Sequence, residues 1–83
     1  MKISYNSELK KNLIGEQIRC LRKEKGKSQR ELAGDMQLQG YSFSELTILR
    51  IEKGQRLVTD IELKILCEYF GVRPDELLGF DEP

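Results

Sequence analysis

The stretch "SFSELTILRIEKGQR", residues 42–56, decides how the rest of this sequence is interpreted. Ile48 and Ile51 are spaced so that they share one face of a helix, and Gly54 supplies a stop just beyond them. The segment therefore predicts a short helix over about residues 44–53. The opposite face of that helix would offer a mixed set of side chains to a partner: Glu45, Leu46, Leu49 and Arg50.

Two further helices are predicted before this stretch. Apolar residues at helical spacing indicate a helix within residues 13–25, and Gly26 ends it. Ser28, three residues before Glu31, forms a capping-box pattern, in which both side chains satisfy free backbone N–H groups at a helix start. A second helix therefore begins there, with an inward face made of Leu32, Ala33 and Met36.

Two more helices are predicted after it. Thr59 and Glu62 repeat the capping-box pattern and open a helix that runs to Phe70. Pro74 is suited to the first position of a last, short helix, because its missing N–H would have no partner there in any case. No segment shows the sustained two-residue alternation of a strand, so the sequence predicts an all-α fold of five helices.

Length and composition place this fold in one small domain. The chain has 83 residues, 39% of them apolar, and we expect a domain over residues 13–79, an N-terminal extension over residues 1–12 and a C-terminal tail over residues 80–83. No run approaches the ~18 consecutive apolar residues of a membrane span, and the N-terminus lacks the apolar core of a signal peptide. We therefore expect a cytoplasmic location without a membrane partner.

The residue types present argue against catalysis. The sequence contains no histidine, which is the commonest general base and metal ligand, and no glycine-rich phosphate loop. We expect no enzyme activity, no cofactor and no metal site. Cys20 and Cys67 have no CxxC spacing, so they are interpreted as reduced and mostly buried, with a disulfide or metal pair as the less favoured alternative.

The charges are divided unevenly along the chain although they sum to zero. Residues 1–56 carry twelve Lys or Arg and seven Asp or Glu, whereas residues 57–83 carry two basic and seven acidic residues. This division favours one positive and one negative face. A positive face can bind a polyanion even when the net charge is zero. An even scatter of charge around the fold remains the alternative.

The motifs together resemble the phage-repressor/Cro-type (XRE) helix-turn-helix family. The matching segments are "LIGEQIRCLRKEKGKSQRELA", "TILRIEKGQR" and "LKILCEYFGVRPDELL", which cover about residues 13–78. The resemblance implies a five-helix repressor-like bundle whose partner is double-stranded DNA. In such a bundle the third helix lies in the major groove while the second crosses the DNA backbone.

The resemblance also assigns roles to individual residues. Bases would be contacted from the third helix by Glu45, Leu46, Leu49 and Arg50. Phosphates would be contacted from the start of the second helix and from the loop after the third, by Ser28, Gln29, Arg30, Lys53, Gln55 and Arg56. Both roles have a physical reason, because a helix N-terminus binds anions and cationic side chains displace counterions from DNA. Solvated surface charge remains the alternative for Lys53 and Arg56.

Arg22 and Glu52 match a family pair that joins the first and third helices. Their role would be structural, and its size depends on burial. Deleting one partner of a buried ion pair costs about 3–5 kcal/mol, whereas an exposed pair contributes under about 1 kcal/mol.

Two features depart from the usual family pattern. Seven residues separate Met36 from Ser44, and we expect Leu38, Tyr41 and Phe43 to pack beneath this long connection. A bacterial subgroup that contains the segment "GQRLVTDIEL" resembles this arrangement. The first residues of the third helix are also unusual. Glu45, an anion, and Leu46, a hydrocarbon, occupy positions where the family more often has amides or cations.

The cap of the third helix is ambiguous in the sequence. Ser44 is the cap by alignment with the family. Ser42 and Glu45 also satisfy the capping-box pattern, and in that arrangement Glu45 would fold back on the backbone and be lost to base contact.

The fourth helix carries more apolar residues than one core face needs. Leu63, Leu66, Cys67 and Phe70 match the inward positions of the family. A second stripe, together with the C-terminal turn, could form a homodimer contact: Ile61, Ile65, Tyr69 and Phe80. Packing of this stripe under residues 1–12 is the alternative.

Two functions remain open at this point. The first is a transcriptional regulator, in particular a repressor, that binds DNA as a dimer and can be controlled by a regulatory protein partner. The second is a protein-interaction module on the same fold, such as an antitoxin, an anti-repressor or a complex subunit, that binds DNA weakly or not at all. The neutral net charge and the acidic C-terminal segment "DELLGFDEP" motivate the second hypothesis.

Overall fold

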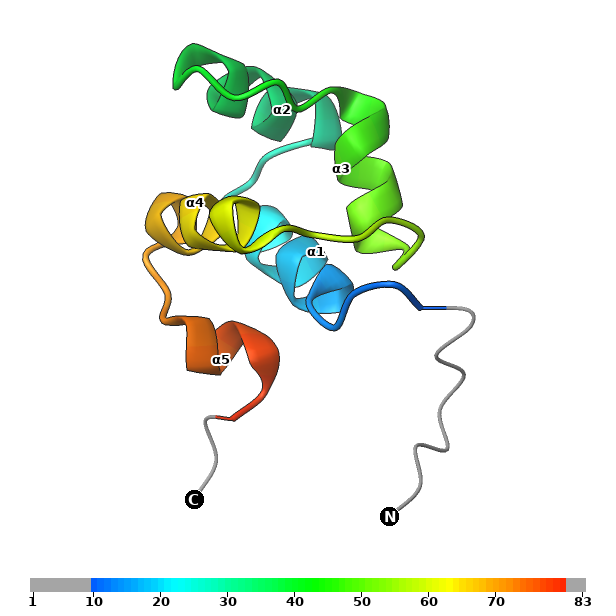
Figure 1. The fold of residues 1–83 in the computed structure, drawn as a ribbon. Coiled ribbons are helices and arrows are strands. Elements are labelled where there is room, and N and C mark those ends of the chain that lie inside the picture. Colours follow the sequence, from blue (N-terminus) through cyan, green and yellow to red (C-terminus); the bar gives the residue numbers. More distant parts are fainter. Residues whose placement is uncertain (1–9, 81–83) are drawn as a thin grey trace.

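Five helices follow one another along residues 10–80, which is the part of the chain that the computed structural model describes (Figure 1). No strand occurs within those residues, so the predicted all-α class and helix number are confirmed. No helix among them is long and apolar enough to cross a membrane. The helices are α1 (Gly15–Glu24), α2 (Gln29–Leu38), α3 (Glu45–Glu52), α4 (Asp60–Phe70) and α5 (Pro74–Leu78).

The predicted caps begin the helices that they were expected to begin. The Ser28 hydroxyl accepts a hydrogen bond from the Glu31 N–H at 3.0 Å, and the Glu31 carboxylate accepts from the Ser28 N–H at 2.8 Å. Thr59 and Glu62 form the same reciprocal pair at the start of α4. Each pair satisfies two backbone donors that have no partner within the helix.

One core holds the bundle together. Its central residues come from α1, α2, α3, α4 and α5, and the side chains that are almost fully buried are Ile18, Leu32, Met36, Ile48, Ile51, Leu66 and Leu77. α2 and α3 pack against each other, and α1 packs against α3 (Figure 1). This packing fixes the orientation of α3 relative to the start of α2, which is the geometry that a helix-turn-helix requires.

The fourth helix buries a wider arc than the sequence suggested. Ile65 is only 7% exposed and belongs to the core, so the expectation that it lies in an exposed stripe is wrong. Tyr69 is half-buried, and its hydroxyl donates a hydrogen bond to Asp35 on α2. Ile61 and Phe80 are exposed, at 68% and 75%. The reason is that α4 has neighbours on two flanks, because Tyr69 contacts Asp35 of α2 and α4 also packs against α5.

Two smaller expectations about burial are also corrected. α2 continues through Leu38, whose side chain is 88% exposed and does not pack beneath the connection to α3. Phe43 is buried there as expected, and Tyr41 is partly buried. Cys67 is buried, but Cys20 is exposed on α1, contrary to the expectation that both thiols are mostly buried.

α1 begins so close to the end of α3 that only glycine fits at position 15. A Cβ atom on Gly15 would lie 2.4 Å from the carbonyl oxygen of Ile51 and 2.8 Å from that of Glu52. Both obstacles are backbone atoms, so neither can rotate away.

We therefore expect Gly15→Ala to lower the free energy of unfolding by about 1–3 kcal/mol, as overpacked core substitutions do. Gly34→Ala is the matched control, because Gly34 is also helical and has nothing within 4 Å of an added Cβ. The control should raise stability by about 0.4–1 kcal/mol. Urea unfolding of the two variants measures the difference, and equal stabilities would contradict the close approach.

Candidate nucleic-acid interface

One face of α3 is turned away from the core. Ile48, Ile51 and Glu52 are buried on the inner face. On the outer face Glu45, Leu46 and Arg50 are exposed, and Leu49 is half-buried at its edge. Because these four residues recur at helical spacing, they form one continuous surface along the helix. The structure thus brings together the four residues that the sequence assigned to base contact.

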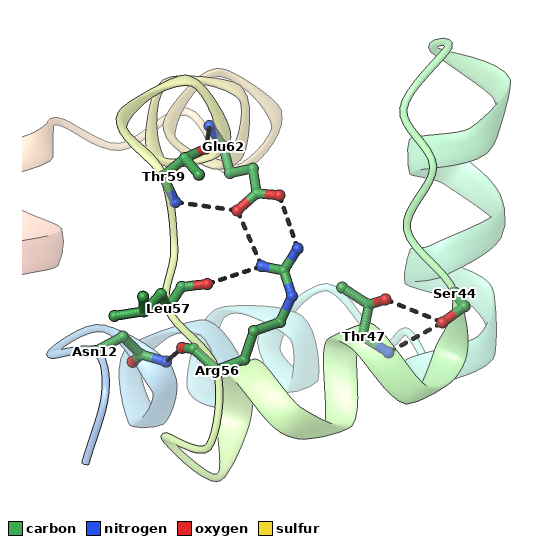
Figure 2. A network of polar contacts seen from close by, with 7 residues as sticks. All are labelled: Asn12, Ser44, Thr47, Arg56, Leu57, Thr59 and Glu62. Carbon is green, nitrogen blue, oxygen red and sulfur yellow. Dashed lines mark hydrogen bonds and ion pairs between the residues drawn. The ribbon is translucent and has the colours of Figure 1, made fainter. Parts of the chain in front are cut away.

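Ser44, and not Ser42, caps α3. The Ser44 hydroxyl accepts a hydrogen bond from the Thr47 N–H at 3.1 Å and lies 3.0 Å from the Thr47 hydroxyl (Figure 2). Glu45 is therefore the first residue of the helix, and its side chain does not fold back to cap an earlier backbone N–H. Glu45 is exposed at the N-terminal end of α3.

A buried ion pair fixes α3 on α1. Arg22 and Glu52 are 8% and 6% exposed. The Arg22 Nε donates to Glu52 Oε2 at 2.6 Å, and its Nη2 donates to Glu52 Oε1 at 3.0 Å. Gln29, at the start of α2, donates to the same carboxylate at 3.1 Å. The hydrogen bond that Arg22 donates to Glu52 raises the pKa of Arg22, so the guanidinium stays charged. Side chains from α1, α2 and α3 thus meet at one carboxylate.

The predicted phosphate-contacting residues do not all have free side chains. Gln29 is half-buried and uses its amide in the contact with Glu52. Arg56 is engaged by a neighbour on α4. The other members of the set are exposed: Ser28, Arg30, Lys53 and Gln55.

Arg56 forms a bidentate ion pair with Glu62 (Figure 2). Its Nη1 and Nη2 donate to the two carboxylate oxygens at 2.9 Å each, and Nη1 also donates to the Leu57 carbonyl at 2.9 Å. The guanidinium is the main cause of the lowered pKa of Glu62, and Glu62 in turn raises the pKa of Arg56. The positive charge of Arg56 is therefore balanced within the domain, a feature that the sequence interpretation missed.

Residues just before α1 join this region, although the sequence analysis placed them in an extension. Asn12 donates to the carbonyls of Ile51 and Arg56 at 3.1 and 2.9 Å, and its side-chain oxygen accepts from the N–H groups of Ile14 and Gly15 at 3.0 and 2.9 Å. The Lys11 N–H donates to the Gly54 carbonyl at 2.7 Å. An asparagine just before a predicted helix was the one available signal, because asparagine is a preferred cap. The rest of the predicted extension, residues 1–9, lies outside the described residues.

A second polar cluster lies apart from α3. Asp35 on α2 accepts hydrogen bonds from the Tyr69 hydroxyl and from Lys27. The hydrogen bond from Tyr69, followed by that from Lys27, lowers the pKa of Asp35. Burial, with the contact to Asp35, raises the pKa of Tyr69 to about 12. The cluster joins α2 to α4 and presents no group to the outer face of α3.

Comparisons with known proteins agree with this geometry. A family model described as a helix-turn-helix domain matches residues 13–79. The structure is similar to the crystal structure of the DNA-binding domain of BldD, with 30% identity, a TM-score of 0.69, and coverage of 89% of this chain and 99% of that one. It is also similar to the S. venezulae BldD DNA-binding domain, with 29% identity, a TM-score of 0.69, and coverage of 87% and 99%. No match was found among the curated proteins.

The family match covers most of the chain, and the similar structures agree with it in fold and in sequence. This chain belongs to the helix-turn-helix domain family, in its phage-repressor-like (XRE) form.

Proposed function

We propose that this protein is a sequence-specific DNA-binding transcriptional regulator that represses by occupying its site. The single observation that carries the proposal is that Arg50 is exposed on the outer face of α3, together with Glu45 and Leu46. The match to a helix-turn-helix family and the similarity of this chain to two DNA-binding domain structures support the proposal. No group of metal-ligating side chains gathers within residues 10–80, and the proposed activity is binding without catalysis.

In this proposal α3 enters the major groove. Arg50 can donate to both acceptors of a guanine edge, which discriminates against another base by about 1–3 kcal/mol. Leu46 can contact a thymine methyl group, and Glu45 can accept a hydrogen bond from a cytosine amino group. Exposed side chains on both sides of α3, among them Arg30 and Lys53, would lie along the phosphates and set the register.

We further propose that the protein acts as a dimer. One module of this size buries only about 600–1,000 Å² on DNA, so useful affinity needs a second copy on a half-site about one turn away. Ile65 is in the core and cannot take part in this contact. We propose that Ile61 and Phe80, the exposed apolar members of the predicted stripe, form it together with the exposed Leu57.

Replacement of Ile61 by glutamate is expected to shift a dimer to the monomer, because a charge would be buried without a partner. Sedimentation equilibrium of the native and variant proteins measures the mass. Leu38→Glu is the matched control, since Leu38 is at least as exposed but lies on α2. An unchanged mass for Ile61→Glu would remove this surface from the proposal.

A protein-interaction module remains the second candidate function. One observation favours it: Arg56, a predicted phosphate ligand, has its charge balanced by Glu62. Glu45 adds a negative charge to the surface that would meet DNA.

Selection of bound duplexes from a random pool decides between the two candidates. We expect the native protein to enrich a motif that contains a guanine in each half-site, as Arg50 requires. A pool that stays random after repeated rounds would favour the interaction module.

A further inference from the structure

The Arg56 guanidinium is only partly used by the contacts within the domain. A guanidinium carries five N–H groups in a rigid plane. Glu62 takes one N–H from each terminal nitrogen, and the Leu57 carbonyl takes the second N–H of Nη1. The two remaining N–H groups, on Nε and on Nη2, lie along one edge of the plane. This edge is a complete two-donor fork.

The Nε end of this edge is not buried. Nε has no hydrogen-bond partner within residues 10–80, and no buried side-chain nitrogen or oxygen among those residues lacks a partner. Nε must therefore be accessible, which agrees with the 33% exposure of the Arg56 side chain. In Figure 2 this edge faces the side on which Ser44 and Thr47 of α3 lie.

The groups that hold the other edge are themselves fixed. Glu62 is only 17% exposed, and its carboxylate also accepts a hydrogen bond from the Thr59 N–H at 3.0 Å. The Arg56 backbone is held from the opposite side by Asn12. An unrestrained arginine side chain loses rotamer entropy when it is fixed on a ligand. Here that restriction already exists in the free protein.

We propose that Glu62 is a positioning residue for DNA binding, which holds one edge of the Arg56 guanidinium so that the Nε–Nη2 edge is a preformed fork for a backbone phosphate. This inference rests on the proposed function. A phosphate matches the fork because planar, two-donor contacts to phosphate oxygens are the strongest that arginine makes. Glu62 thus helps binding, although it adds a negative charge near a polyanion.

Two simpler roles for Glu62 predict different effects on DNA affinity. If Glu62 only withheld Arg56 from DNA, its removal would tighten binding. If the pair only closed the loop between α3 and α4, Arg56→Lys, which can still pair with Glu62, would bind nearly as tightly as the native protein. Asp60 provides the matched control for charge, because it lies in the same turn of α4, is exposed, and its side chain forms no hydrogen bond or ion pair within the described residues.

The experiment measures binding of a labelled random-sequence duplex by fluorescence anisotropy, at a temperature where circular dichroism shows every variant to be folded. Asp60→Asn should bind as tightly as the native protein or slightly more tightly. Glu62→Gln should bind about three- to tenfold more weakly than Asp60→Asn. In an Arg56→Ala background the two substitutions should have the same effect. Arg56→Ala alone should make the negative slope of log K against log salt shallower by about 0.9 for each domain bound, because one phosphate contact is lost.

Rescue separates the fork from the charge. Arg56→Lys keeps the charge without the fork, so we expect it to retain the salt slope but to bind about as weakly as Glu62→Gln. Glu62→Gln binding that equals or exceeds that of Asp60→Asn in the native background would overturn the inference while leaving DNA binding intact. Native protein without salt-sensitive binding would instead overturn the proposed function, and this inference with it.

Discussion

Replacement of Glu52 by alanine is expected to lower the free energy of unfolding by about 3–5 kcal/mol. The substitution leaves Arg22 charged, almost buried and without its two carboxylate contacts, and it also removes the acceptor of Gln29. Within the described residues, the Arg22 side chain then retains one hydrogen-bond partner, the Lys27 carbonyl, which accepts from Nη1 at 2.9 Å. In a domain of this size that loss is a large part of the total stability.

Two controls identify burial as the cause. Glu68→Ala removes a carboxylate from an exposed pair with Lys64, so it should cost under about 1 kcal/mol. Replacement of both Arg22 and Glu52 by apolar residues of similar volume should cost much less than Glu52→Ala alone, because no charge is left unpaired. Chemical unfolding measures all three. A loss below about 1 kcal/mol for Glu52→Ala would mean that the pair is not the buried link between α1 and α3.

Replacement of Arg50 by alanine is expected to remove a guanine preference at one position of each half-site. The affinity for the selected sequence should fall by about 1–3 kcal/mol per half-site, because the side chain that can take both guanine acceptors is gone. Salt-sensitive binding to random duplex should persist, since the groups that can lie along phosphates are unchanged. Selection from a random pool with the variant measures the change in motif.

Arg30→Ala is the matched control for Arg50→Ala. Arg30 is an exposed arginine on α2, where the proposed contact is to phosphate. Its loss should weaken binding to all sequences alike and leave the motif unchanged. An Arg50→Ala variant that selects the native motif would show that this residue does not read a base.

The caps of α2 and α4 could be predicted because each depends on a short, specific pattern, and the ion pair because the family resemblance supplies it. Ser28 and Thr59 begin helices through local hydrogen bonds that the spacing of two side chains determines. The contact between Arg22 and Glu52 was expected from the family resemblance, and the structure shows it; the structure also shows that the pair is buried, which the sequence left open. The choice of Ser44 over Ser42 as the cap also came from the resemblance, because local spacing allowed both.

The remaining features could not be predicted because they depend on tertiary neighbours. Periodicity gives the direction of one apolar stripe, but it does not show that α4 is covered on two flanks, which is why Ile65 was misplaced. The pairing of Arg56 with Glu62 depends on how the loop after α3 returns to α4. The contact of Asn12 with the end of α3 likewise joins residues far apart in the sequence. The last two contacts shape the candidate interface, and the position of Asn12 just before a helix was the one signal of them in the sequence.

The most direct test of DNA binding by this domain is the salt dependence of its affinity for duplex DNA. We expect a dimer that contacts about 6–10 phosphates to lose about 10³–10⁵ in affinity between about 50 and 200 mM salt. The log–log plot should be linear across that range, because counterions are released in proportion to the phosphates contacted. Affinity that is absent at low salt, or that does not change with salt, would contradict DNA binding through the outer face of α3.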